Sequence, residues 1–224
     1  MHVAEAVRSR RSVRGFLDRP VPPEVLRSVV AEAARAPSGG NLQPWRLFVL
    51  AGEPLAQLKA RMEQRLRSNP QPVAAEYEVY PRPMPEPYRT ERDRLAEAMY
   101  GLLGIPREQK LQRLMWMQNN YRFFGAPAAL FCYIDRRMGP PQWSDLGMYL
   151  QTLMLLLRGH GLDSCAQEAW SLFHDTVREF IAPPQEWMLF SGMAIGYADP
   201  SSKLEALHSE RMPVDSFATF MGVP

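Results

Sequence analysis

The sequence predicts a protein of the α+β class, with one mixed central sheet of about four to five strands covered by helices. Helical and strand-like patterns alternate along the 224 residues, and only about four short segments have the apolar character of strands. A chain of this length can bury one sizeable core without needing a second. We therefore expect a single domain over residues 1–224, with a proline-rich insertion at about 70–90.

The individual elements follow from periodicity and from the residues that begin helices. Apolar residues at helical spacing, some after prolines or a capping residue, predict helices over residues 3–9, 22–34, 55–68, 90–103, 108–124, 144 to about 158, and 175–181. Apolar, β-branched and aromatic runs predict strands over residues 46–50 and 128–135, around residue 164, and over 188–197.

Two apolar features need a surface that covers them. The helix that starts near Ser144 and Asp145 is apolar nearly all round, so we expect it in the centre of the core or at a subunit interface. The tail over residues 201–224 has little secondary-structure signal but carries Phe217 and Phe220. A neighbouring subunit would provide a surface for such a tail.

Composition and charge exclude several classes of protein. The net charge of +2 is too small to indicate a nucleic-acid or membrane-surface partner. The N-terminus has no apolar stretch typical of a signal peptide, and the apolar run Met148–Leu157 is too short to span a bilayer. Cys132 and Cys165 stand far apart and form no CxxC pair, which indicates reduced thiols. We therefore expect a cytoplasmic protein that binds neither nucleic acid nor membrane.

Several common catalytic motifs are missing from the sequence. It contains no GxGxxG segment after a strand, no Walker A segment and no GxSxG elbow. Its four histidines lack the spacing and the cysteine partners of a metal site, so we expect no metal. With no metal and no evident nucleophile, a reaction carried by a bound organic cofactor becomes the favoured interpretation.

A basic segment near the N-terminus is the first candidate binding motif. Residues 10–14 read Arg-Arg-Ser-Val-Arg, and no acidic residue interrupts them. Because alternate residues of an extended stretch point the same way, Arg10, Ser12 and Arg14 would converge on one anion. A planar guanidinium group suits phosphate oxygens, and a hydroxyl group adds a donor. The alternative is a solvated basic loop.

A second motif, APSGGNLQPW over residues 36–45, combines two glycines with three polar side chains. The glycines let backbone N–H groups approach a ligand closely. Ser38, Asn41 and Gln43 add hydroxyl and amide edges. A plain connection between a helix and a strand needs no such density of amide groups, so the motif favours a ligand-binding loop.

These motifs, taken in order with three more, resemble the nitroreductase family of FMN-dependent flavoproteins over nearly the whole chain. The segments are RRSVRGF, APSGGNLQPW, GLDSCAQEAW, GMAIGYAD and SERMP. The stretches YPRPMPEPYR, NNYRFFGAP and QWSDLGMYLQTLML are similar to a branch that includes nitrobenzoate reductases. The resemblance implies a nitroreductase-like α+β fold in an interlocked homodimer, with two FMN molecules at the interface.

The resemblance also implies a reaction and a set of binding residues. NADH or NADPH would pass hydride to FMN N5, and a nitroaromatic, quinone or similar small planar acceptor would then take the electrons in a ping-pong cycle. No side chain is expected to be catalytic. The FMN-binding residues would be Arg10, Arg11 (through its backbone or side chain), Ser12, Arg14 and Arg211, with Pro37, Ser38, Gly39 and Asn41 from the other subunit, and the loop Gln167, Glu168 and Ala169 near flavin N5 and O4.

This chain departs from the family pattern in three places. Glu205 stands where relatives often carry Asn before the final arginine, and the loop at 165–169 lacks the Pro or Gly common there. The family's ring-contacting Asn and Lys find no clear counterpart within 70–125.

The proline-rich insertion has two interpretations. Its prolines exclude regular helix over residues 70–88, and long irregular segments are often functional. Tyr80 and Tyr88 offer flat faces on which a planar acceptor would stack, so we expect them in the substrate pocket. The second interpretation, of equal weight, is a surface connection in which the tyrosines pack against the prolines.

Three alternative functions stay open at this point. The same scaffold supports other FMN reactions, such as enone reduction or reductive dehalogenation. A flavin-binding protein without turnover is a second alternative. A protein that uses the fold for interaction, with no flavin, is the third.

Overall fold

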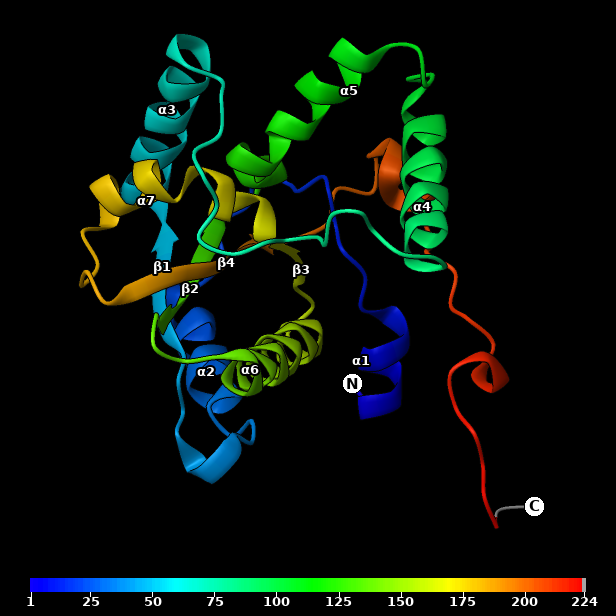
Figure 1. Cartoon of the computed structure of the whole chain (residues 1–224). Coiled ribbons are helices and arrows are strands. Elements are labelled where there is room, and N and C mark those ends of the chain that lie inside the picture. Colours follow the sequence, from blue (N-terminus) through cyan, green and yellow to red (C-terminus); the bar gives the residue numbers. More distant parts are fainter. Residues whose placement is uncertain (223–224) are drawn as a thin grey trace.

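A four-stranded antiparallel sheet organises the computed structural model of the chain, which describes residues 1–222 (Figure 1). The strands are β1 (Arg46–Ala51), β2 (Ala128–Asp135), β3 (Asp163–Gln167) and β4 (Trp187–Gly196), in the spatial order β1-β2-β4-β3. Each neighbouring pair is antiparallel. The α+β class and the strand number are as predicted. Parallel pairing, expected in a mixed sheet, is confined within residues 1–222 to the isolated bridge between Ser12 and Ser164.

The central strand β2 is buried on both faces, and its residues alternate between two cores. Ala129, Phe131 and Tyr133 belong to one core, together with α3 and α7 residues. Leu130 and Ile134 belong to the other, together with α2 and α6 residues. Successive side chains of a strand point to opposite faces, so this continuous apolar run requires helices on both sides of the sheet.

The helices accordingly form two layers around the sheet. On one side lie α2 (Pro23–Ala33) and α6 (Pro140–Gly159), and on the other α3 (Gly52–Ser68) and α7 (His174–Ile181) (Figure 1). The remaining helices are α1 (Val3–Ser9), α4 (Tyr88–Leu103) and α5 (Lys110–Met117), with 3-10 turns η1 (Gly39–Asn41), η2 (Gln118–Gly125), η3 (Glu168–Phe173), η4 (Lys203–Ala206) and η5 (Val214–Ser216).

Two helices differ from the sequence prediction by four residues or more at one end, and the others by three or fewer. α6 begins at Pro140, capped at Gly139, and not near Ser144, because prolines in the first turn need no hydrogen-bond partner for the missing N–H. The helix expected over 108–124 ends at Met117 and continues as η2. There Phe123 and Phe124 adopt left-handed φ angles of 51° and 52°, which an α-helix does not allow.

The apolar features noted in the sequence are only partly covered within one chain. α6 buries Leu146, Leu153 and Leu157, whereas Met148 on the same helix is exposed. The C-terminal tail runs away from the body beyond α1 (Figure 1), and Phe217 and Phe220 are 68% and 58% exposed. None of the helices in the described range is long and apolar enough to cross a membrane.

Candidate functional site

The basic segment over residues 10–14 leaves α1 in an extended conformation and runs beside β3. The Val13 N–H donates to the Ser164 carbonyl oxygen at 3.0 Å, and Ser12 forms a bridge with Ser164. Val13 is buried in the core while Ser12 is exposed, so the two residues face opposite ways. The segment therefore has the alternation on which the predicted convergence of Arg10, Ser12 and Arg14 depends.

The charges of this segment act on the thiol of β3. Burial raises the pKa of Cys165 to about 11, while the nearby Arg14 and Arg10 charges oppose that rise. The Arg14 guanidinium also donates to the Ser12 carbonyl oxygen at 3.3 Å. Arg10, Ser12 and Arg14 thus gather near one residue of β3.

Arg211 joins this group from the other end of the chain. Burial and then the Arg211 charge lower the pKa of Arg10, which reflects two cations held near one another. The Arg211 Nη1 donates to Ser209 Oγ at 2.7 Å and to the Ser209 carbonyl oxygen at 3.0 Å. Within residues 1–222, no salt bridge involves Arg10, Arg14 or Arg211. Arg10, with Arg211 near it and Arg14 on the same segment, forms a candidate anion site, and Glu168 lies near the same thiol as Arg10 and Arg14.

Arg11 is engaged elsewhere. Its Nη1 donates to the Glu205 carbonyl oxygen at 2.6 Å, and its Nη2 pairs with the Glu205 carboxylate. Of the two contributions predicted for Arg11, a backbone contact remains compatible with this arrangement, since the side chain is held by Glu205.

The glycine loop before β1 is exposed and tightly turned. Gly40 and Asn41 both have a φ of 56°, a left-handed conformation that Gly and Asn adopt more readily than other residues. The hydrogen bonds that hold the loop include those from the Gln43 N–H to Ser38 Oγ (3.0 Å) and from the Gly39 N–H to Asp145 Oδ1 of α6 (3.2 Å). Pro37 is also exposed.

One chain does not bring the glycine loop to the arginine cluster. The loop lies at the end of α2 that points away from α4 and the C-terminal segment (Figure 1). A ligand held by both groups would therefore need them from two different chains.

The predicted loop over residues 167–169 begins where β3 ends. Gln167 is buried, and its Nε2 donates to the Asn120 carbonyl oxygen at 2.7 Å and to Asn120 Oδ1 at 3.2 Å. Glu168 is exposed, and the Tyr121 hydroxyl donates to the Ala169 carbonyl oxygen at 3.3 Å. The Gln167 side chain thus fixes the start of the loop and does not extend toward solvent.

Asn120 was missed by sequence reasoning. It lies in η2, within a stretch expected to be a continuous helix, and the structure places it against the predicted loop. The run of three amides over residues 118–120, between Met117 and Tyr121, was the available signal.

The first half of the proline-rich insertion is anchored to η3 and to strand β4. The Val73 N–H donates to the Leu172 carbonyl oxygen at 3.0 Å, and the Leu189 N–H donates to Glu76 Oε2 at 3.1 Å. The Tyr77 hydroxyl donates to a carbonyl oxygen of β4. These contacts fit the interpretation of this half as a packed connection.

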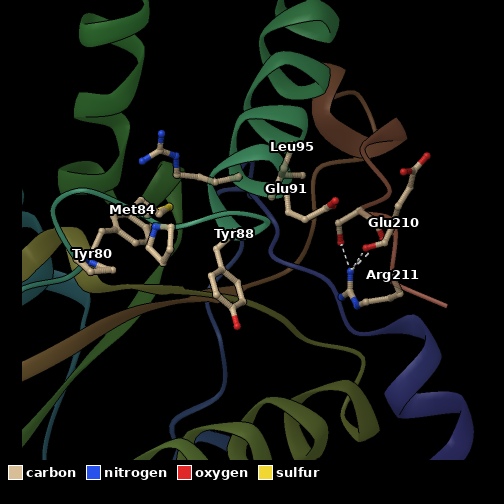
Figure 2. A pocket seen from close by; sticks show the side chains of 11 residues that line it. Tyr80, Met84, Tyr88, Glu91, Leu95, Glu210 and Arg211 are labelled. Atoms are coloured by element: carbon tan, nitrogen blue, oxygen red, sulfur yellow. Dashed lines mark hydrogen bonds between the residues drawn. The ribbon is translucent and has the colours of Figure 1, made fainter. Parts of the chain in front are cut away.

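The second half of the insertion lines a hollow of about 670 Å³. Tyr80 and Tyr88 both line it and both are exposed, and Tyr88 is the first residue of α4. Arg211 lines the same hollow, and Figure 2 shows Tyr80 and Met84 at one end with Glu210 and Arg211 at the other. The predicted substrate tyrosines and the predicted phosphate arginine therefore share one cavity.

Comparison with known proteins gives matches along almost the whole chain. The model described as "Nitroreductase family" matches residues 7–197. A nitrobenzene nitroreductase of Ectopseudomonas oleovorans is 34% identical over 219 residues, which is 98% of this chain and 96% of the relative. A 4-nitrobenzoate reductase of Nocardioides sp. (strain LMS-CY) is 35% identical over 217 residues, 96% of this chain and 88% of the relative.

Solved structures give the same result for the fold. The FMN and NADPH-dependent nitroreductase NfnB from Sphigopyxis sp. strain HMH is 42% identical, with a TM-score of 0.93 and 100% of both chains covered. The FMN-dependent NfnB from Mycobacterium smegmatis, solved in complex with NADPH, is 28% identical, with a TM-score of 0.92 and 98% of both chains covered.

Proposed function

Because the chain belongs to the nitroreductase family, we propose that it is an FMN-dependent oxidoreductase that takes hydride from NADH or NADPH. The acceptors we propose are nitroaromatics, quinones and similar small planar molecules. Relatives named as nitrobenzene and 4-nitrobenzoate reductases support this choice. When bound, FMN supplies the hydride chemistry at N5. The protein itself must bind the cofactor, orient the acceptor and exclude unsuitable acceptors.

One feature carries the cofactor proposal: the Arg211 charge helps to lower the pKa of Arg10, so two cations lie near one another, and neither forms a salt bridge within residues 1–222. Two like charges repel, so this arrangement is unfavourable unless an anion lies between them. A phosphate monoester fits this charge, since Arg14 and the exposed Ser12 lie on the same extended segment and offer further donors. Each charge-assisted hydrogen bond contributes roughly 1.5–3 kcal/mol, so a few suffice to retain the cofactor.

The remaining contacts to the cofactor come, in this proposal, from a homodimer. Pro37, Ser38, Gly39 and Asn41 of the partner chain would face the arginine cluster, because one chain holds the two groups apart. Met148 on the outer side of α6 and the exposed aromatic side chains of the tail would be covered in the dimer.

The flavin ring would then lie near the loop of Gln167, Glu168 and Ala169, with the acceptor beside Tyr80 and Tyr88. The Gln167–Asn120 contact holds the start of that loop rigidly, which suits backbone N–H groups that must face the ring. Protons would come from solvent, and we assign no catalytic side chain and no metal. We further propose that residues 1–224 act as one FMN-binding domain in the cytoplasm.

The absorbance spectrum of the purified protein tests the flavin proposal, and anaerobic reduction tests the reaction. We expect flavin absorbance that bleaches rapidly with NADH or NADPH and recovers when a nitroaromatic is added. If the flavin absorbance recovers only with an enone or a halophenol, the protein catalyses another FMN reaction and not nitroreduction. A yellow protein that does not bleach would indicate a flavin-binding module, and a protein that stays colourless with added FMN would contradict the cofactor assignment.

A further inference from the structure

Arg11 makes two contacts with Glu205, although the residues are far apart in sequence. One guanidinium nitrogen donates to the Glu205 carbonyl oxygen at 2.6 Å, and another pairs with the carboxylate. The Arg11 side chain is 25% exposed and that of Glu205 is 44% exposed, so the pair is partly screened from water. Because the contact involves both the carboxylate and the backbone of Glu205, it holds the backbone of η4 in place as well as the Glu205 carboxylate.

η4 is docked on three sides. Leu204 is buried against Met99 and Tyr100 of α4. Ser202 caps η4 and lies so close to Gly15 that a Cβ on Gly15 would come within 2.6 Å of Ser202 Oγ. The Arg11 contacts close the third side. η4 therefore lies between α4 and the segment that carries the predicted phosphate-binding residues.

Arg211 follows η4 through a loop with mostly local contacts. The hydrogen bonds of its guanidinium go to Ser209 and to the Glu210 carbonyl oxygen. Such contacts set the shape of the loop but not its position on the protein. The position comes from η4 and from the neighbouring Glu210 carboxylate, which pairs with Arg94 of α4 at 3.6 Å, and it must withstand the repulsion between Arg211 and Arg10.

We propose that Arg11 and Glu205 form a positioning pair, which holds η4 against the basic segment so that Arg211 meets Arg10 before any ligand binds. Arg11 is then a positioning residue and its side chain is not a phosphate ligand. The identity of the anion rests on the proposed function, whereas the docking of η4 does not. Preorganising the site removes part of the cost of ordering it on binding.

The proposal reverses the result that simple electrostatics predicts for Glu205. A carboxylate near an anion site repels the anion, so its removal should strengthen FMN binding. If the pair positions Arg211, the removal should weaken binding instead. Glu205→Gln separates the two because the side chain keeps nearly the same size while the charge is lost.

The experiment uses the full-length protein with Glu205→Gln, Arg11→Gln, and the reversed pair Arg11→Glu with Glu205→Arg. FMN affinity is measured by fluorescence titration. In the flavin-free protein, tryptic cleavage is followed by mass spectrometry at the bonds after Lys203 and Arg211, which all variants share, and is scored separately from the new site that Glu205→Arg creates. Glu63→Gln is the matched control, because Glu63 is 42% exposed and pairs with Arg67 and Arg122 on another surface.

We expect each single variant to raise the FMN Kd about three- to tenfold, as for a partly exposed ion pair with an added hydrogen bond. Cleavage should accelerate by a similar factor, and the reversed pair should recover most of both losses. Arg11→Lys keeps the charge but not the two-point contact, so it should show a smaller loss of the same kind.

Unchanged cleavage together with equal or tighter FMN binding in Glu205→Gln would overturn the proposal. So would a large loss in Arg11→Gln with no loss in Glu205→Gln, since Arg11 would then contact the phosphate directly. If the wild-type protein binds no FMN, the proposed function fails, and the cleavage rates alone then decide whether the pair docks η4.

Discussion

Arg211→Ala should weaken FMN binding while leaving the flavin-free protein as stable as before, or slightly more so. In the flavin-free protein Arg211 has no acidic partner, and its hydrogen bonds are to Ser209 and Glu210 of its own loop. Its charge acts unfavourably on Arg10, whose pKa it helps to lower. Removing Arg211 therefore removes a repulsion and no packing.

The two effects differ in size as well as in sign. An exposed substitution of this kind changes the free energy of unfolding by no more than about 0.5 kcal/mol. Losing one charge-assisted hydrogen bond to a phosphate costs roughly 1.5–3 kcal/mol, which is about ten- to hundredfold in Kd. Removing Arg211 also relieves its repulsion with Arg10 in the flavin-free protein, and this relief weakens FMN binding further because it stabilises the unbound state. We therefore expect the increase in Kd to lie in the upper part of that range at low salt, where the repulsion is least screened.

Fluorescence titration with FMN at low and high salt measures the affinity, and thermal unfolding of the flavin-free protein measures the stability. Arg61→Ala is the control, since Arg61 is an exposed arginine that pairs with Glu179 away from the site. Unchanged FMN affinity in Arg211→Ala would refute the phosphate assignment. A marked loss of stability without FMN would refute the inference that Arg211 is held against repulsion.

Three further predictions test other parts of the structure. Mixed dimers with Arg14→Ala on one chain and Asn41→Ala on the other should retain one intact FMN site, and two equally damaged sites would place both loops in one subunit. Tyr80→Ala or Tyr88→Ala should raise the acceptor KM or change acceptor preference in stopped-flow experiments, with flavin content and the NAD(P)H half-reaction nearly unaltered; unchanged acceptor kinetics in both variants would contradict the pocket assignment. Burial raises the pKa of Cys132 from 9.0 to about 12, so the folded thiol stays protonated while the unfolded one ionises. Stability should therefore fall as pH rises above 9, by about 1.4 kcal/mol per pH unit from this thiol, and Cys132→Ala should show a shallower fall in urea unfolding.

The features that the sequence determined by itself are those with a local period. Ala128 to Asp135 could be assigned to a buried strand because a short, continuous apolar run is typical of a strand covered on both faces. The structure places that strand within the sheet, between two neighbouring strands. The alternation of the basic segment likewise follows from the two-residue period of extended chain. The contact between the basic segment and β3, in contrast, could not be predicted from any local pattern in the sequence.

Only the tertiary structure decided which distant residues meet. Arg211 approaches Arg10, Glu205 holds Arg11, and Gln167 contacts Asn120. Each of these side chains had many chemically equivalent partners in the sequence, and nothing local distinguishes one from another. The choice among them comes from the sheet order and from the docking of η4 and η2, which depend on packing of the whole core. For the same reason, the end of α5 differs from the periodic pattern, because the left-handed turn at Phe123 and Phe124 is set by packing outside the helix.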